Sequence, residues 1–174
     1  MLSQVTFCVV DLETTGSSSS VGGITEIGAV KYRGGEEVSR FSTLINPGQP
    51  IPANIVMLTG ISSSMVADAP RIEDVLEIFL DFVQGTVLVA HNAPFDLSFL
   101  KASAALHGYT WPNFRVIDTV KAARFVLTKD DVANYQLGTL AIYFRTEISP
   151  NHRALDDALA TVDVLHGIIE RMGT

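Results

Sequence analysis

The sequence near the N-terminus reads Thr6-Phe7-Cys8-Val9-Val10-Asp11-Leu12-Glu13, a run rich in β-branched and aromatic residues. This composition predicts a buried β-strand that ends at Thr14-Thr15-Gly16 and a serine-rich loop. Strand side chains alternate between faces, so Asp11 and Glu13 point to the same side. Two carboxylates beside a core are costly unless a cation compensates them. Taken alone, the pair also fits an ordinary solvated strand end.

The rest of the chain predicts an α/β layer structure with a mixed sheet, built as a single domain over residues 1–174. Residues 46–70 contain four prolines and are expected to be mostly irregular, with a short helix over 53–58. The expected elements follow from the spacing of apolar residues and from turn signals. Strands are expected at 24–32, 38–45, 86–90 and 115–117, and helices at 71–83, 94–107, 119–125, 136–144 and 154–172.

Composition excludes several classes of protein. The chain has 174 residues, 12 Lys+Arg against 19 Asp+Glu, and a net charge of −7. This balance argues against a protein that coats duplex nucleic acid, although not against an enzyme that grips one end. One cysteine, Cys8, cannot form an internal disulfide. Neither a signal peptide nor an apolar run of membrane-spanning length is visible, so a cytoplasmic protein without a membrane partner is expected.

A second polar cluster, His91-Asn92-Ala93-Pro94-Phe95-Asp96, follows the strand expected at 86–90 and opens a helix. Active sites of α/β proteins usually lie at this position. Taken alone, the cluster also fits a capping role for Asn92 and a first-turn dipole role for Asp96.

A third cluster, Asn151-His152-Arg153-Ala154-Leu155-Asp156-Asp157, begins the last helix. At about 100° per residue, Asp156 falls on the solvated face, whereas Asp157 falls on the margin of the apolar face and can turn inward. Asp157 is therefore the better candidate for a ligand. His152 lies in the preceding loop, where an isolated histidine is more often a surface residue than a catalyst.

Carboxylates on separate elements, together with a histidine, suit one chemistry. Mg²⁺ or Mn²⁺ takes oxygen ligands, and two such ions about 4 Å apart can clamp a phosphodiester. A histidine can take the proton from the attacking water. The candidate ligands for such ions are Asp11, Glu13, Asp96 and Asp157, and the candidate base is His152.

The three clusters, in this order, resemble the motifs of the DnaQ-like, DEDDh-type 3′→5′ exonucleases, and the likeness runs from about residue 6 to residue 169. The other branch of that family has a tyrosine where this chain has Arg153. The resemblance implies an RNase H-like fold, with a five-stranded mixed sheet, a central first strand and flanking helices. It also implies two-metal hydrolysis, in which Asp11 touches both ions and Glu13 and Asp157 complete one site. In the same mechanism Asp96 supports the metal-bound waters, and His152 serves as the general base.

The same resemblance implies that nucleoside 5′-monophosphates are released from a free 3′ end. Residues that line the substrate would be Thr14, Thr15, Gly16, Leu58, Thr59, His91, Asn92 and Phe95. Apart from the resemblance, local positive side chains could guide the strand or could equally be ordinary surface residues; these are Lys101, Arg124, Lys129 and Arg153. The segment 51–61 resembles proofreading members, which favours single-stranded DNA as substrate and a DNA polymerase or a larger parent chain as partner.

Two alternatives stay open at this point. One is an exoribonuclease that trims RNA ends or short oligoribonucleotides with the same chemistry, since no residue decides whether a 2′-OH is accepted. The other is an inactive scaffold that binds a polymerase or a strand end. Loss of a ligand residue would indicate the scaffold, and none of the expected ligands is lost.

Overall fold

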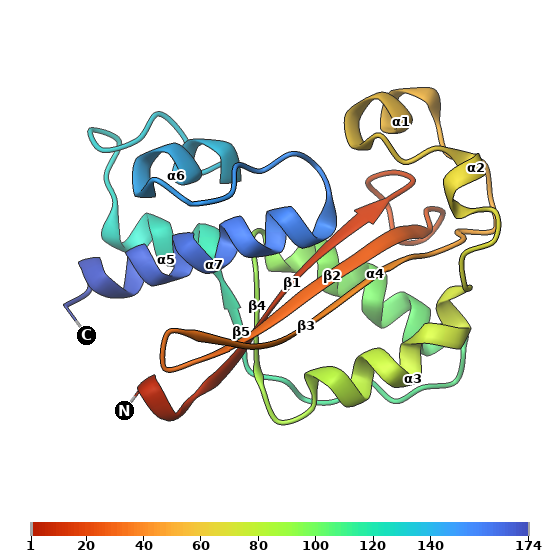
Figure 1. Ribbon diagram of the computed structural model, residues 1–174, viewed down its shortest axis with the longest axis horizontal. Coiled ribbons are helices and arrows are strands. Elements are labelled where there is room, and N and C mark those ends of the chain that lie inside the picture. The colour runs from red at the N-terminus through yellow and green to blue at the C-terminus, as the bar shows by residue number, and fades with distance from the viewer. Residues whose placement is uncertain (1, 174) are drawn as a thin grey trace.

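The computed structural model describes residues 2–173, and its centre is a five-stranded sheet in the order β3-β2-β1-β4-β5 (Figure 1). β1 pairs antiparallel with β2 and parallel with β4, so the sheet is mixed and β1 lies at its centre. The predicted mixed sheet with a central first strand is confirmed. The strands are β1 (Thr6–Thr14), β2 (Ile24–Arg33), β3 (Glu36–Leu44), β4 (Val87–Ala90) and β5 (Val116–Asp118).

Helices fill most of the remaining chain, and all except η1 and α2, which were not predicted, agree with the predicted ones to within a few residues. They are η1 (Leu2–Gln4), α1 (Ala53–Thr59), α2 (Ser63–Val66), α3 (Ile72–Val83), α4 (Ala93–Leu106), α5 (Thr119–Val126), α6 (Leu137–Phe144) and α7 (Ala154–Arg171). α2 lies in a stretch that was expected to be irregular. Ser62 caps it by accepting a hydrogen bond from the Met65 N–H. A helix of four residues is too short for hydrophobic periodicity to reveal.

Different helices cover the two faces of the sheet (Figure 1). Alternation along β1 determines which side chains meet which helix. Phe7 and Val9 pack in one cluster with residues of α7, whereas Cys8 and Val10 pack in another with residues of α3 and α4. α5 and α6 in turn pack against α7. Asp11 and Glu13 continue the alternation of Phe7 and Val9, so they lie on the α7 side.

β1 extends past the end of its parallel neighbour. Pairing with β4 covers Phe7 to Val9, whereas pairing with β2 continues to Thr14. The Asp11–Thr14 part therefore projects beyond β4, at the edge where β4 and β5 also end. This carboxyl edge of the parallel strands is where α/β proteins usually place their sites.

Cys8, the only cysteine in the sequence, is enclosed in the core between the sheet, α3 and α4. Its side chain is 0% exposed, and burial raises the pKa of the thiol to about 12. The reactive thiolate form is therefore strongly disfavoured.

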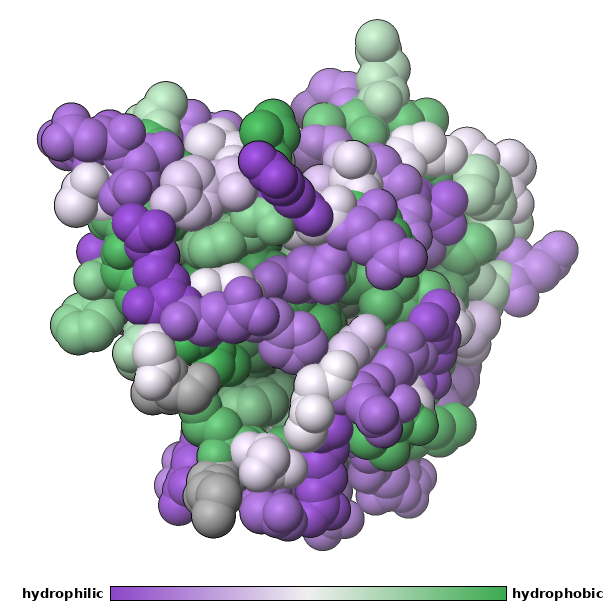
Figure 2. Space-filling model, turned by 60° about the vertical axis from the view of Figure 1, so that its left-hand side comes forward, coloured by the Kyte–Doolittle hydropathy of each residue, from purple (hydrophilic) through white to green (hydrophobic). Residues whose placement is uncertain are grey.

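The surface combines hydrophilic and hydrophobic residues. On the face seen in Figure 2, hydrophilic residues cover most of the area, and hydrophobic residues show between them. Among residues 2–173, no helix combines the length and the apolar character that crossing a bilayer requires.

Candidate active site

The end of β1 brings Asp11 and Glu13 to the carboxyl edge of the sheet. Opposite them in the antiparallel register with β2 lie Gly28 and Glu26. Glu13 is buried, and a register shift follows directly between Glu13 and Thr14. This irregularity ends the regular pairing at the point where the chain turns into the loop beyond β1.

Asp96 enters the site from the first turn of α4. It is 3% exposed, and its Oδ1 accepts a hydrogen bond from the Leu12 backbone N–H at 3.0 Å. Leu12 lies in the part of β1 that has passed the end of β4, so Asp96 binds a backbone donor that the parallel neighbour does not reach. Asp96 is therefore fixed against β1 as well as placed near the helix N-terminus.

The start of α7 supplies the third part of the site. Asp157 is buried, and its Oδ1 accepts a hydrogen bond from the Asn151 backbone N–H at 2.9 Å. Asp156 is half-buried, and its Oδ2 accepts a hydrogen bond from the Asn151 side chain at 2.6 Å. The predicted inward orientation of Asp157 is confirmed. His152 is exposed, with a φ of 60° in the left-handed region.

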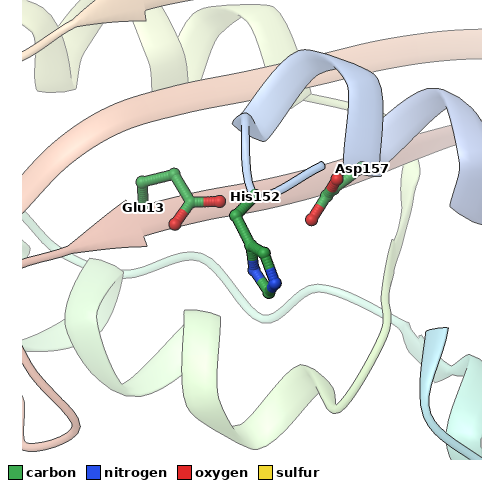
Figure 3. A group of neighbouring side chains, drawn as sticks. All are labelled: Glu13, His152 and Asp157. Carbon is green, nitrogen blue, oxygen red and sulfur yellow. The ribbon is translucent and has the colours of Figure 1, made fainter. Parts of the chain in front are cut away.

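Glu13, His152 and Asp157 form one group (Figure 3). One ligand atom from each residue lies within 4.8 Å of the others. The three residues come from the end of β1, from the loop before α7 and from the first turn of α7. Asp11 and Asp96 are not members of this three-residue group, but Asp96 bonds to the backbone next to Asp11 and Glu13.

Burial and mutual repulsion raise the pKa values of the acids. The pKa of Asp11 lies well above its usual range, first because the carboxyl is desolvated and then because neighbouring carboxylates carry the same charge. Burial raises the pKa of Glu13 to about 8 and that of Asp96 to about 7. Desolvation also raises the pKa of Asp157, although the Asn151 N–H opposes it. Clustered carboxylate oxygens of this kind fit a hard divalent cation, which would offset their charge.

A pocket of about 420 Å³ adjoins Glu13 and runs between the end of β1 and α1. We call it the β1–α1 pocket. It is lined by six of the predicted substrate-binding residues, namely Thr14, Thr15, Gly16, Leu58, Thr59 and Phe95. Its size lies at the small end of the range for ligand sites, which begins at about 300 Å³.

The threonines of this pocket also stabilise its walls by hydrogen bonds. Thr14 Oγ1 donates to the Gly16 carbonyl at 2.7 Å, and Thr15 Oγ1 accepts from the Gly23 N–H at 2.9 Å. Thr59 Oγ1 donates to the Ile55 carbonyl at 2.9 Å. Among the apolar side chains that line the pocket are Phe95, which is half-buried, and Leu58, which is 51% exposed.

The structure separates His91 and Asn92 from the β1–α1 pocket. They line a different groove of about 540 Å³, together with residues of α5 and of the loop before α6. His91 Nδ1 lies 2.8 Å from Thr119 Oγ1. The predicted capping role of the Asn92 side chain is wrong. The Asn92 backbone is left-handed, with a φ of 64°, and among residues 2–173 its side chain makes no cap hydrogen bond. Its backbone N–H instead donates to Asp118.

Residues 25–30 also resemble a segment of the exonuclease family in sequence, but the sequence assigned no role to Glu26 within them. This buried acid on β2 binds Arg153, so the guanidinium expected to guide a strand is already engaged by a carboxylate. The partners are 127 positions apart in the chain, and no periodic signal in β2 would reveal the partner of this acid.

A family model described as Exonuclease (RNase_T) matches residues 8–165, a range that includes all three clusters. The chain belongs to this exonuclease family. It is therefore a nuclease, and the predicted enzyme class is confirmed.

Similar proteins agree with this membership. This chain is 50% identical over 178 residues to a Mycobacterium tuberculosis protein named "Putative bifunctional exonuclease/endonuclease protein". The match covers 99% of this chain and 28% of that protein. The chain is 46% identical over 166 residues to a PolC-type DNA polymerase III of Caldanaerobacter subterraneus, covering 95% of this chain and 12% of the polymerase. The exonuclease thus spans less than a third of the length of either relative.

Solved structures agree in fold. An exonuclease X bound to duplex DNA with a 5′ overhang superposes on this exonuclease with a TM-score of 0.75 at 30% identity, covering 97% of this chain and 93% of that one. Apo exonuclease I superposes with a TM-score of 0.83, covering 98% of this chain and 43% of that one. Its identity is only 16%, so this likeness concerns the fold alone. The predicted RNase H-like fold is confirmed.

Proposed function

We propose that the protein is a metal-dependent exonuclease that removes nucleotides one at a time from the 3′ end of single-stranded DNA. One observation carries the proposal: the group formed by Glu13, His152 and Asp157 directly adjoins the β1–α1 pocket, and the two share Glu13. A pocket of this size suits one terminal nucleotide better than a duplex. A bond cut beside such a pocket would release a mononucleotide.

The proposed cofactor is a pair of divalent cations, Mg²⁺ or Mn²⁺. Asp11 would touch both ions, Glu13 and Asp157 would complete one site, and Asp96 would hold metal-bound waters in place. When bound, such ions lower the pKa of an attacking water and offset the charge that builds up on the phosphate. The raised pKa values of the acids support this assignment, because a cation would favour their charged forms.

The residues of the chain perform the remaining steps. His152 is the proposed general base that takes a proton from the attacking water. Its exposure leaves it open to solvent, to which the proton can pass. Leu58 and Phe95 would hold the terminal base or sugar by apolar contact, and the braced loop from Thr14 to Gly16 would lie beside the terminal nucleotide. Since His91 and Asn92 lie in a separate groove, any contact they make would be with another part of the strand.

The similar proteins favour DNA over RNA as substrate. Relatives at 38–46% identity carry the name PolC-type DNA polymerase III, and the exonuclease X at 30% identity was solved with DNA. Because the chain spans only 12% of such a polymerase, we also propose that it acts with, or within, a larger protein of DNA replication or repair. RNA is the alternative substrate, and the experiment described next distinguishes it from DNA.

The test compares matched DNA and RNA oligonucleotides of one sequence, labelled at the 5′ end, with Mn²⁺, Mg²⁺ or EDTA. We expect the DNA to give a ladder that shortens from its 3′ end, mononucleotide products, slower cutting of RNA, and no cutting in EDTA. A 3′-phosphate should impede cutting. Products that carry 3′-phosphates, or cleavage of closed circular single strands, would contradict the proposal.

A further inference from the structure

One buried acid, Glu26, holds the chain that leads into α7 against β2. Glu26 is 4% exposed. Its Oε1 accepts a hydrogen bond from Arg153 Nη2 at 2.7 Å, and its Oε2 accepts from Arg153 Nε and from the Ala154 N–H, both at 3.0 Å. A bidentate arginine–carboxylate pair fixes direction as well as distance. The Ala154 N–H is one of the donors that a helix leaves free at its N-terminus, so Glu26 caps α7 from a neighbouring strand.

β2 also permits α7 to come this close. Gly28 follows Glu26 by two positions and therefore shares its face of the sheet. A Cβ at Gly28 would lie 2.4 Å from the carbonyl carbon of Ala154 and from the nitrogen of Leu155, a separation that real Cβ atoms essentially never show. Gly28 sets how near the helix can lie, and Glu26 sets its direction.

The segment fixed in this way carries the proposed chemistry. His152 directly precedes Arg153, and the Asp157 N–H donates to the Arg153 carbonyl at 2.9 Å. Asp157 in turn accepts a hydrogen bond from the Asn151 N–H. The segment 151–157 is thus closed on itself, and Glu26 ties it to the sheet. Glu26 also lies directly opposite Glu13 in the register of β1 and β2.

We infer that Glu26 is a positioning residue, which holds His152 and Asp157 close enough to Glu13 for the three to act at one cation. Both oxygens of Glu26 already accept hydrogen bonds from Arg153 or Ala154. These three hydrogen bonds direct the carboxylate at the segment, and the role we assign to it is to hold the segment. The inference rests on the metal-dependent function proposed above.

Glu26→Gln tests the inference, because the amide keeps the size of the side chain and an acceptor for the Ala154 N–H but loses the charge that binds Arg153. We expect kcat on single-stranded DNA to fall about 10–100-fold and the affinity for Mn²⁺, titrated by electron paramagnetic resonance without DNA, to fall about tenfold. KM should change less than about threefold, because the β1–α1 pocket is not touched.

A matched control breaks an ion pair at the other end of the same helix. Arg171 Nη2 lies 3.0 Å from Asp131 Oδ1, and Arg171→Gln removes this bridge. Its kcat and Mn²⁺ affinity should stay within about twofold of the unaltered protein, as for most surface changes. Equal losses in the two variants would mean that general loosening of α7 is responsible, and would overturn the inference.

Arg153→Ala keeps the inference testable if Glu26→Gln does not fold, since the Arg153 side chain is 39% exposed. It should reproduce both losses. Unaltered kcat and Mn²⁺ affinity in the folded variant would overturn the positioning role and leave the proposed function standing. Failure of the unaltered protein to cut DNA with any metal would instead defeat the proposed function, and Mn²⁺ binding alone would then decide the role of Glu26.

Discussion

Asp156 and Asp157 are chemically identical neighbours that occupy different environments. Asp157 is buried beside Glu13 and His152, whereas Asp156 is half-buried and bonded to the Asn151 side chain. We predict that Asp157→Asn lowers the rate at least ~10³-fold, because it weakens a site for charge stabilisation. Asp156→Asn should stay within about twofold, since its amide oxygen can still accept from Asn151. Initial rates on one 5′-labelled strand at saturating Mn²⁺ compare the two, and the opposite order would mean that the site assignment is wrong.

His152 should affect the rate without removing the metal. We predict that His152→Ala lowers the rate roughly 10²–10⁴-fold, because the attacking water loses its base. The residual rate should rise with pH as hydroxide takes over that task. Cleavage rates from pH 6 to 9 test the prediction, with a Mn²⁺ titration of the same variant as control. If Mn²⁺ binding is lost along with activity, His152 is a ligand and not the base.

The sequence predicted the orientation of individual acids where a regular period applies. Alternation along β1 placed Asp11 and Glu13 on one face, and the helical period separated Asp157 from Asp156. No period connects Glu26 with Arg153, because their contact depends on how α7 crosses the sheet. Such tertiary contacts could not be read from the spacing of residues.

Among the elements, the contact between β2 and the start of α7 leaves no room for added volume, because the nearest atoms to a Cβ at Gly28 belong to the backbone. We predict that Gly28→Ala destabilises the protein by about 1–3 kcal/mol and also lowers the cleavage rate, because the new Cβ must push the start of α7 away. Gly167→Ala is the control: its Cβ would lie 2.3 Å from the Phe144 ring, near the far end of the same helix. Both variants should unfold at lower urea concentration. Only Gly28→Ala should lose activity in the folded state, and equal activity losses would contradict this account.

The long elements were predictable, and so were the short strands β4 and β5 and the short helix α1, whereas α2 and the left-handed residues were not. Repeated apolar spacing revealed α3 and α7, and the Gly34-Gly35 pair revealed the β2–β3 turn. α2 has too few residues for a period, and the left-handed backbone of Asn92 and His152 is unusual for residues other than glycine. The separation of His91 and Asn92 from the β1–α1 pocket arises from how α4 and α5 pack, which local sequence does not encode.

For the molecule as a whole, the acids of the site should make stability depend on pH. Their pKa values are raised in the native state, for Glu13 from 4.5 to about 8, so the native protein binds more protons than the unfolded chain across that window. The free energy of unfolding should therefore fall as pH rises from about 4.5 to about 8 in EDTA. Urea denaturation at several pH values measures this. A single unfolding transition is expected if residues 1–174 form one domain, as we propose.

A bound metal ion should remove the pH dependence of the free energy of unfolding, because it binds the deprotonated acids of the native state. Saturating Mg²⁺ or Mn²⁺ should raise the unfolding midpoint more at pH 8 than at pH 5. Asp11→Asn is the control and should show a shallower pH dependence in EDTA and a smaller gain from metal. Equal gains from metal at both pH values would count against a carboxylate site.

Because the thiol of Cys8 is enclosed, a cysteine introduced at the surface can be labelled selectively with a fluorescent dye. Maleimide dyes react with thiolates, and this one is 0% exposed with a pKa of about 12, so the native protein should remain unlabelled. Met57 on α1 is 88% exposed and precedes Leu58, which lines the β1–α1 pocket. Met57→Cys should therefore accept one fluorophore at a known place, and its emission could report the arrival and departure of each strand end in real time.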